Sequence, residues 1–80
     1  MKTKTMNNIN RTETSVKNGI KIIRTAIKKK ISLSEASRQS NFGRNYVSDI
    51  KARIKDNYKN RRINRETYNE FKELMKTYTR

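Results

Sequence analysis

The sequence contains no cysteine, histidine, proline or tryptophan. Without cysteine the chain has no disulfides, and without cysteine and histidine it lacks the soft and imidazole ligands of structural zinc sites. We therefore expect no metal ion and no cofactor. Hydrophobic residues make up only 31% of the 80 residues. A chain of this size forms one domain at most, whose core supplies about 3–5 kcal/mol.

Catalytic groups are also scarce. The missing histidine is the side chain that titrates nearest to neutral pH, so general acid–base chemistry is disfavoured. With Gly19 and Gly43 as the only glycines, there is no glycine-rich loop for a nucleotide phosphate. The seven acids form no recognisable catalytic constellation in the sequence: Glu13, Glu35, Asp49, Asp56, Glu66, Glu70 and Glu73. The sequence predicts a protein that is not an enzyme and has no small-molecule ligand.

Positive charge is abundant instead. Lysine and arginine total 21 against 7 acids, a net charge of +14. An excess of this size attracts polyanions, although nucleic acids, membranes and acidic proteins all qualify. No apolar run approaches the ~20 residues of a membrane span, and residues 1–11 lack the apolar middle of a signal peptide. We expect no membrane partner and a cytoplasmic protein, close to the nucleoid of a bacterial or phage-infected cell.

The hydrophobic spacing predicts helices throughout and no strand. Residues 1–12 lack periodicity and are expected to form a flexible basic tail, with a basic arm on DNA as the alternative. A first helix is predicted from Glu13 to Lys30, because apolar residues recur there every three or four positions. A second follows Ser32, which has Glu35 three residues later in a capping-box pattern.

The second predicted helix ends at Asn41-Phe42-Gly43, where asparagine and glycine tolerate a sharp turn. A third begins near Arg44 and runs to about Tyr58. Residues 59–63 form a basic connector, and the fourth helix spans residues 64–79 with Asn64 as its cap. The expected fold is an all-α, four-helix domain over residues 13–80.

Residues 33–52, LSEASRQSNFGRNYVSDIKA, resemble the helix-turn-helix of bacterial and phage DNA-binding proteins. Ala36 and Ser37 are the small residues where two helices would cross. Asn41 stands at the turn, where the family usually has glycine. Phe42 follows as the expected buried plug, and Val47 with Ile50 would pack the second motif helix onto the first.

The resemblance implies that the third predicted helix enters the major groove of DNA. Its start and solvent face supply the expected base contacts: Arg44, Asn45, Tyr46 and Ser48. The expected phosphate contacts are Gly43, Lys51, Arg53, Lys55, Lys59, Arg61 and Arg62. Tyr46 could instead pad the domain surface. Asp49 could accept a hydrogen bond from cytosine, but an ion pair with Arg53 four residues later is the preferred interpretation.

Apolar residues of the fourth predicted helix recur at heptad-like spacing: Tyr68, Phe71, Met75 and Tyr78. This stripe either closes the monomer core or forms the seam of a homodimer, and we expect some of both.

The leading hypothesis is sequence-specific binding of double-stranded DNA by a phage or mobile-element regulator of the repressor type. The alternative is an architectural or accessory DNA-binding protein, such as an excision or replication factor. A third possibility, an RNA binder or an inhibitor of a host protein, remains open.

Overall fold

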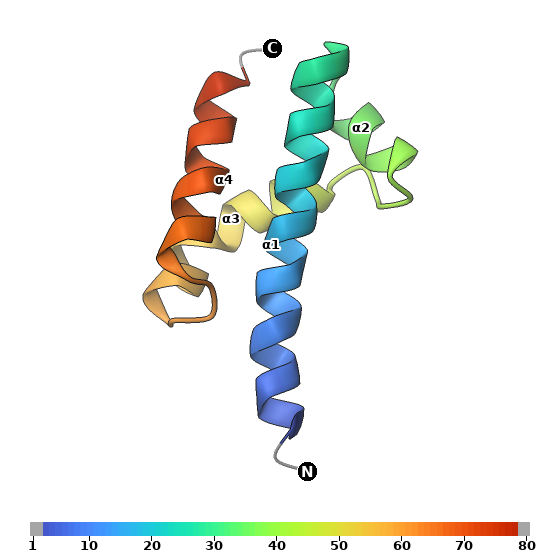
Figure 1. Ribbon diagram of the computed structural model, residues 1–80. Coiled ribbons are helices and arrows are strands. Elements are labelled where there is room, and N and C mark those ends of the chain that lie inside the picture. The colour runs from blue at the N-terminus through green and yellow to red at the C-terminus, as the bar shows by residue number, and fades with distance from the viewer. Residues whose placement is uncertain (1–2, 79–80) are drawn as a thin grey trace.

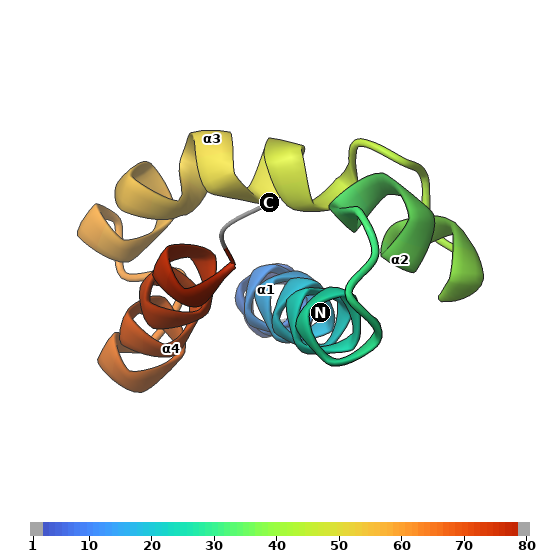
Figure 2. The same cartoon turned by 90° about the horizontal axis from the view of Figure 1, so that it is seen from above.

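The computed structural model describes residues 3–78, with side chains from Thr12 onward. This part of the chain is built from four helices: α1 (Thr3–Lys29), α2 (Leu33–Gln39), α3 (Tyr46–Lys59) and α4 (Arg65–Thr77). It contains no strand, which confirms the all-α prediction. Figure 1 shows α1 and α4 side by side, and Figure 2 shows α3 crossing both on one side while α2 lies beside α1.

The starts of α2 and α4 agree with the capping signals recognised in the sequence. The Ser32 hydroxyl accepts a hydrogen bond from the Glu35 backbone N–H at 3.1 Å, and α2 begins directly after it. The Asn64 side chain accepts from the Thr67 N–H at 2.8 Å and caps α4. The α4 helix ends at Thr77, near the predicted residue 79, which lies outside the described residues.

The first helix was predicted too short. α1 begins at Thr3, ten residues before the expected start at Glu13, so the segment assigned to a tail is helical from Thr3 on. No glycine or proline between residues 3 and 12 interrupts the backbone hydrogen bonds. The apolar periodicity from Val16 onward marked where α1 packs against its neighbours, not where it starts. Residues 1 and 2 lie outside the described part.

The core sits where α1 meets the other three helices. Its buried apolar side chains are Val16, Ile20, Ile22, Ile23, Ala26, Ala36, Val47, Ile50, Ile54, Ile63 and Phe71. Gly19 allows α1 and α3 to approach closely, because a Cβ atom built on it would lie 2.8 Å from Cδ1 of Ile50. Glycine lowers the stability of an isolated helix, but at position 19 its lack of a side chain permits the close crossing of α1 and α3.

Each of the first three helices is followed by a non-glycine residue in the left-handed conformation. These are Lys30 (φ 57°), Asn41 (φ 67°) and Arg61 (φ 60°). A left-handed residue after a helix lets the next backbone N–H groups bond to carbonyls of the last turn, as Ile31 N–H does to Ala26 at 3.0 Å. These compact turns bring α2, α3 and α4 back onto α1.

Polar contacts join α1 to α4. The Glu13 carboxylate accepts hydrogen bonds from the backbone and side chain of Asn64, each at 3.0 Å, and from the Thr67 hydroxyl. Further along, Arg24 and Glu70 form an ion pair. Both contacts link residues more than forty positions apart in sequence.

Candidate nucleic-acid interface

The α2–turn–α3 unit rests on a crossing of small residues. Ala36 and Ser37 are completely buried. Asn41 has the left-handed backbone predicted for the turn, and the Phe42 N–H bonds to the Ser37 carbonyl at 2.9 Å. The hydroxyl of Ser37 has no hydrogen-bond partner, so this residue is present for its size and not for a polar contact.

Phe42 is not the buried plug that the sequence predicted. Its ring is only partly buried and stacks on Tyr46, with ring centroids 4.2 Å apart. Val47 and Ile50, which were expected to pack α3 onto α2, are both buried in the core, and the Ile50 side chain reaches Gly19 on α1. Phe42 therefore packs against the edge of the core instead of filling its interior.

The start of α3 lies slightly later than predicted. Gly43 and Arg44 precede the helix in a turn closed by the Tyr46 N–H and the Gly43 carbonyl at 3.0 Å. Gly43 has no positive φ angle and does not begin the helix, so the expected helix-start phosphate contact at Gly43 loses its geometric basis. Asn45 is the N-cap residue, yet its side chain makes no capping hydrogen bond.

The expected base-contacting residues fall into two groups. Arg44, Asn45 and Ser48 are exposed around the first turn of α3. Tyr46 is partly buried, and its hydroxyl donates to the Ser15 carbonyl at 3.4 Å while its ring stacks on Phe42. Tyr46 is therefore committed to packing, which favours the surface-padding alternative for this residue.

The expected phosphate contacts on α3 and the connector are all exposed: Lys51, Arg53, Lys55, Lys59, Arg61 and Arg62. The ion pairs seen within residues 12–78 involve other cations, namely Lys17, Arg24 and Arg38. The predicted Asp49–Arg53 pair is not formed in that part of the chain. Within residues 12–78 these six cations form no ion pair.

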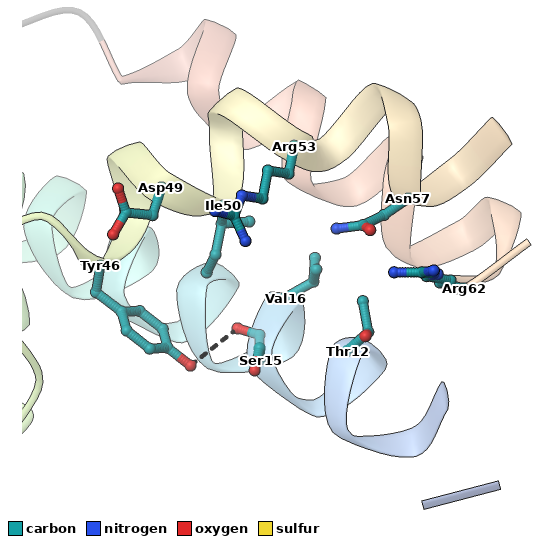
Figure 3. A pocket seen from close by; sticks show the side chains of 9 residues that line it. All are labelled: Thr12, Ser15, Val16, Tyr46, Asp49, Ile50, Arg53, Asn57 and Arg62. Atoms are coloured by element: carbon teal, nitrogen blue, oxygen red, sulfur yellow. Dashed lines mark hydrogen bonds between the residues drawn. The ribbon is translucent and has the colours of Figure 1, made fainter. Parts of the chain in front are cut away.

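A cleft of about 350 Å³ opens between α1 and α3. Figure 3 shows Arg53, Asn57 and Arg62 reaching into it, and Asp49 also lines it, on the side of Tyr46. Thr12 and Ser15 line its α1 side. Two guanidinium groups and an amide that face one cavity suit an oxyanion such as a phosphate group. Sequence reasoning missed Asn57, although its position one turn after Arg53 was the available signal.

Acidic residues also lie on the outer side of α3. Asp49, Ala52 and Asp56 recur at spacings of three and four, opposite the buried Val47 and Ile54. All three are exposed, and neither aspartate side chain makes a hydrogen bond or ion pair with another residue between Thr12 and Tyr78. The cations therefore flank an acidic line instead of covering the helix evenly.

The residues expected to form a dimer seam are largely used within the chain. Phe71 is 1% exposed. Tyr68 stacks on Tyr58 with ring centroids 4.2 Å apart, and the Tyr78 hydroxyl accepts from the Leu33 N–H at 3.1 Å. Met75 is partly buried on a groove between α3 and α4. The α4 stripe closes the monomer core, which is one of the two functions considered for it.

Among residues 12–78 no cluster of acidic side chains could hold a metal ion. None of the described helices has the length and apolarity of a membrane span. Comparison of the chain with protein-family models, curated proteins and solved structures found no match.

Proposed function

We propose that this protein binds double-stranded DNA sequence-specifically, as a small phage or mobile-element regulator in which α2 and α3 act as a helix-turn-helix. One observation carries the proposal: Arg44, Asn45 and Ser48 are exposed around the first turn of α3, and their side chains make no hydrogen bond or ion pair with residues between Thr12 and Tyr78. Arginine can donate two hydrogen bonds to guanine O6 and N7, and asparagine can form two hydrogen bonds with adenine N6 and N7.

The packing of the two helices supports this proposal. A recognition helix must be held rigidly, since small errors in side-chain position lose base contacts. Ala36 and Ser37 provide the close crossing, and Val47 and Ile50 anchor α3 on the core. Asn41 supplies the left-handed turn between the two helices.

The unpaired cations support binding to a phosphate backbone. Arg53 and Arg62 in the cleft would receive one phosphate group, and exposed Lys59 at the end of α3 would lie near another. Contacts of this kind fix the register of a protein on DNA without reading its sequence.

The acidic line formed by Asp49 and Asp56 limits how α3 can approach DNA. Carboxylates repel phosphates, so the middle of α3 must face base edges or stay outside the groove. In the first case Asp49 can accept a hydrogen bond from cytosine N4. The second case favours the alternative function, an architectural or accessory protein held only through its flanking cations.

Binding as a homodimer remains part of the proposal. Helix-turn-helix proteins read two half-sites about one helical turn apart through a two-fold dimer. Because most of the α4 stripe is used within the chain, a dimer would need a different surface or would form only on DNA. Sedimentation of the protein with and without a duplex distinguishes these cases.

Selection from a random duplex pool, combined with a salt titration, tests the function. If the protein is a sequence-specific regulator, we expect one enriched motif. Its affinity for duplex DNA should fall roughly 10³–10⁵-fold between 50 and 200 mM salt, for 6–10 phosphate contacts. Salt-sensitive binding without an enriched motif supports the architectural alternative. An affinity that hardly depends on salt contradicts DNA binding of either kind.

A further inference from the structure

A second concave surface lies away from the α1–α3 cleft, between α3 and α4. It is an open groove of about 600 Å³. Its floor is apolar, formed by Ile54, Tyr68, Phe71 and Met75. Its rims carry four lysines, two on each helix: Lys51 and Lys55 on α3, and Lys72 and Lys76 on α4. We call this surface the lysine-rimmed groove.

The rims are regularly built. On each helix the two lysines are four residues apart, so they stand one above the other about 6 Å apart along the helix axis. All four are exposed. Their alkyl stems extend the apolar floor while the ammonium groups stay in water, and the Lys72 ammonium lies 5.1 Å from the Tyr68 ring centroid. The groove thus presents an apolar strip bordered by positive charge on both sides.

No acidic side chain lines this groove, and its four lysines form no ion pair among residues 12–78. A second copy of the chain is a poor occupant, because a two-fold contact through the groove would bring eight lysines together. Duplex DNA is also a poor occupant, since a phosphate backbone has no apolar ridge to cover Met75 and Tyr68. The occupant must be apolar along its middle and acidic along both edges.

We propose that the lysine-rimmed groove docks an acidic amphipathic helix of a partner protein. Apolar residues of that helix, repeating every three or four positions, would lie on Met75 and Tyr68. Aspartate or glutamate on its two flanks would face the lysines of α3 and α4. This inference does not depend on DNA binding, and it gives the protein a second, protein-directed surface.

The probe is a synthetic helical peptide with leucine at every third or fourth position and glutamate on both flanks. A peptide of the same composition in scrambled order is its control. Binding to the full chain is measured by fluorescence anisotropy and mapped by two-dimensional amide NMR. We expect saturable binding of the ordered peptide, at least tenfold tighter than the scrambled one, with shifts confined to α4 and the facing part of α3.

The decisive variant is Lys72→Glu combined with Lys76→Glu, which reverses the α4 rim without touching the expected DNA contacts. The affinity for the ordered peptide should fall at least tenfold in this variant. The matched control, Lys21→Glu with Lys28→Glu on α1, changes the net charge equally and should alter affinity less than twofold. Circular dichroism confirms that both variants fold.

Four results would overturn the proposal. Equal binding of ordered and scrambled peptides would show attraction by net charge alone. An equal loss of peptide affinity in the two double variants would also show attraction by net charge alone. Self-association of the protein with shifts in the groove, or loss of duplex binding in the Lys72→Glu, Lys76→Glu variant but not in its control, would assign the surface to a second copy or to DNA.

Discussion

The carboxylate of Glu13 in α1 accepts hydrogen bonds from both the backbone and the side-chain nitrogen of Asn64, the residue that caps α4. The start of α4 is therefore fixed by two contacts. Asn64 caps the helix, and Glu13, which lies 51 positions earlier in the chain, binds Asn64. A negative charge at this end also suits the α4 dipole. This contact fixes α4 against α1, and with it one wall of the lysine-rimmed groove.

Glu13→Ala should therefore destabilise the domain by about 1–2 kcal/mol, a loss typical of a removed helix cap. Chemical denaturation measures it. A double-mutant cycle with Thr67→Ala should give a coupling of about 0.5–3 kcal/mol, because Thr67 donates to the same carboxylate. Additive effects of the two substitutions would show that the Glu13 and Thr67 side chains do not stabilise each other.

Ser37→Ala should leave the fold unchanged or stabilise it by about 1 kcal/mol. The Ser37 hydroxyl is buried without a partner, and removing an unsatisfied polar group removes its desolvation cost. Thermal melting compares the variant with the parent chain. A clear loss of stability would reveal that the hydroxyl has a bonded partner in solution.

Phe42→Ala should cost about 1–2 kcal/mol, less than the about 3–5 kcal/mol of a fully buried phenylalanine. The partly buried ring loses its stacking on Tyr46 and some covered area, but it leaves no closed cavity. Urea denaturation gives the value. A loss near 4 kcal/mol would indicate that Phe42 is fully buried, as the sequence predicts.

Gly19→Leu should destabilise the fold by about 1–3 kcal/mol, because a larger side chain would overlap Ile50 at the α1–α3 crossing. Gly19→Ala is the matched control. Its Cβ would crowd only the Cδ1 end of Ile50 and would lie at an ordinary 3.5 Å from Cε1 of Phe71. Alanine favours a helix by about 1 kcal/mol over glycine, so the net effect should be small. Equal stability of the two variants would mean that the crossing is not tightly packed.

Local signals explain which parts of this structure were predictable. The caps at Ser32 and Asn64, the left-handed Asn41 and the small pair Ala36–Ser37 depend on neighbours in sequence, and all were recognised. Helix α1 was predicted to start too late because its first ten residues carry no stop signal and no recognised periodicity.

Contacts between distant segments explain the rest. Glu13 was assigned only as the first residue of a helix, because its partners lie in α4. The burial of Phe42 depends on how the turn is directed, which residue types alone do not determine. In the cleft, Arg53 and Asn57 share a helix face, but the approach of Arg62 depends on the left-handed Arg61, which is neither glycine nor asparagine.

The most direct test of the central claim is a titration of Arg44→Ala and Asn45→Ala against the selected duplex and a scrambled one. Lys21→Ala is the control, since Lys21 lies about 200° around α1 from Gly19, which faces α3. Each variant at the start of α3 should lose about 1–3 kcal/mol on the selected duplex and much less on the scrambled one, and Lys21→Ala should change neither appreciably. Equal losses on both duplexes would contradict base reading by α3.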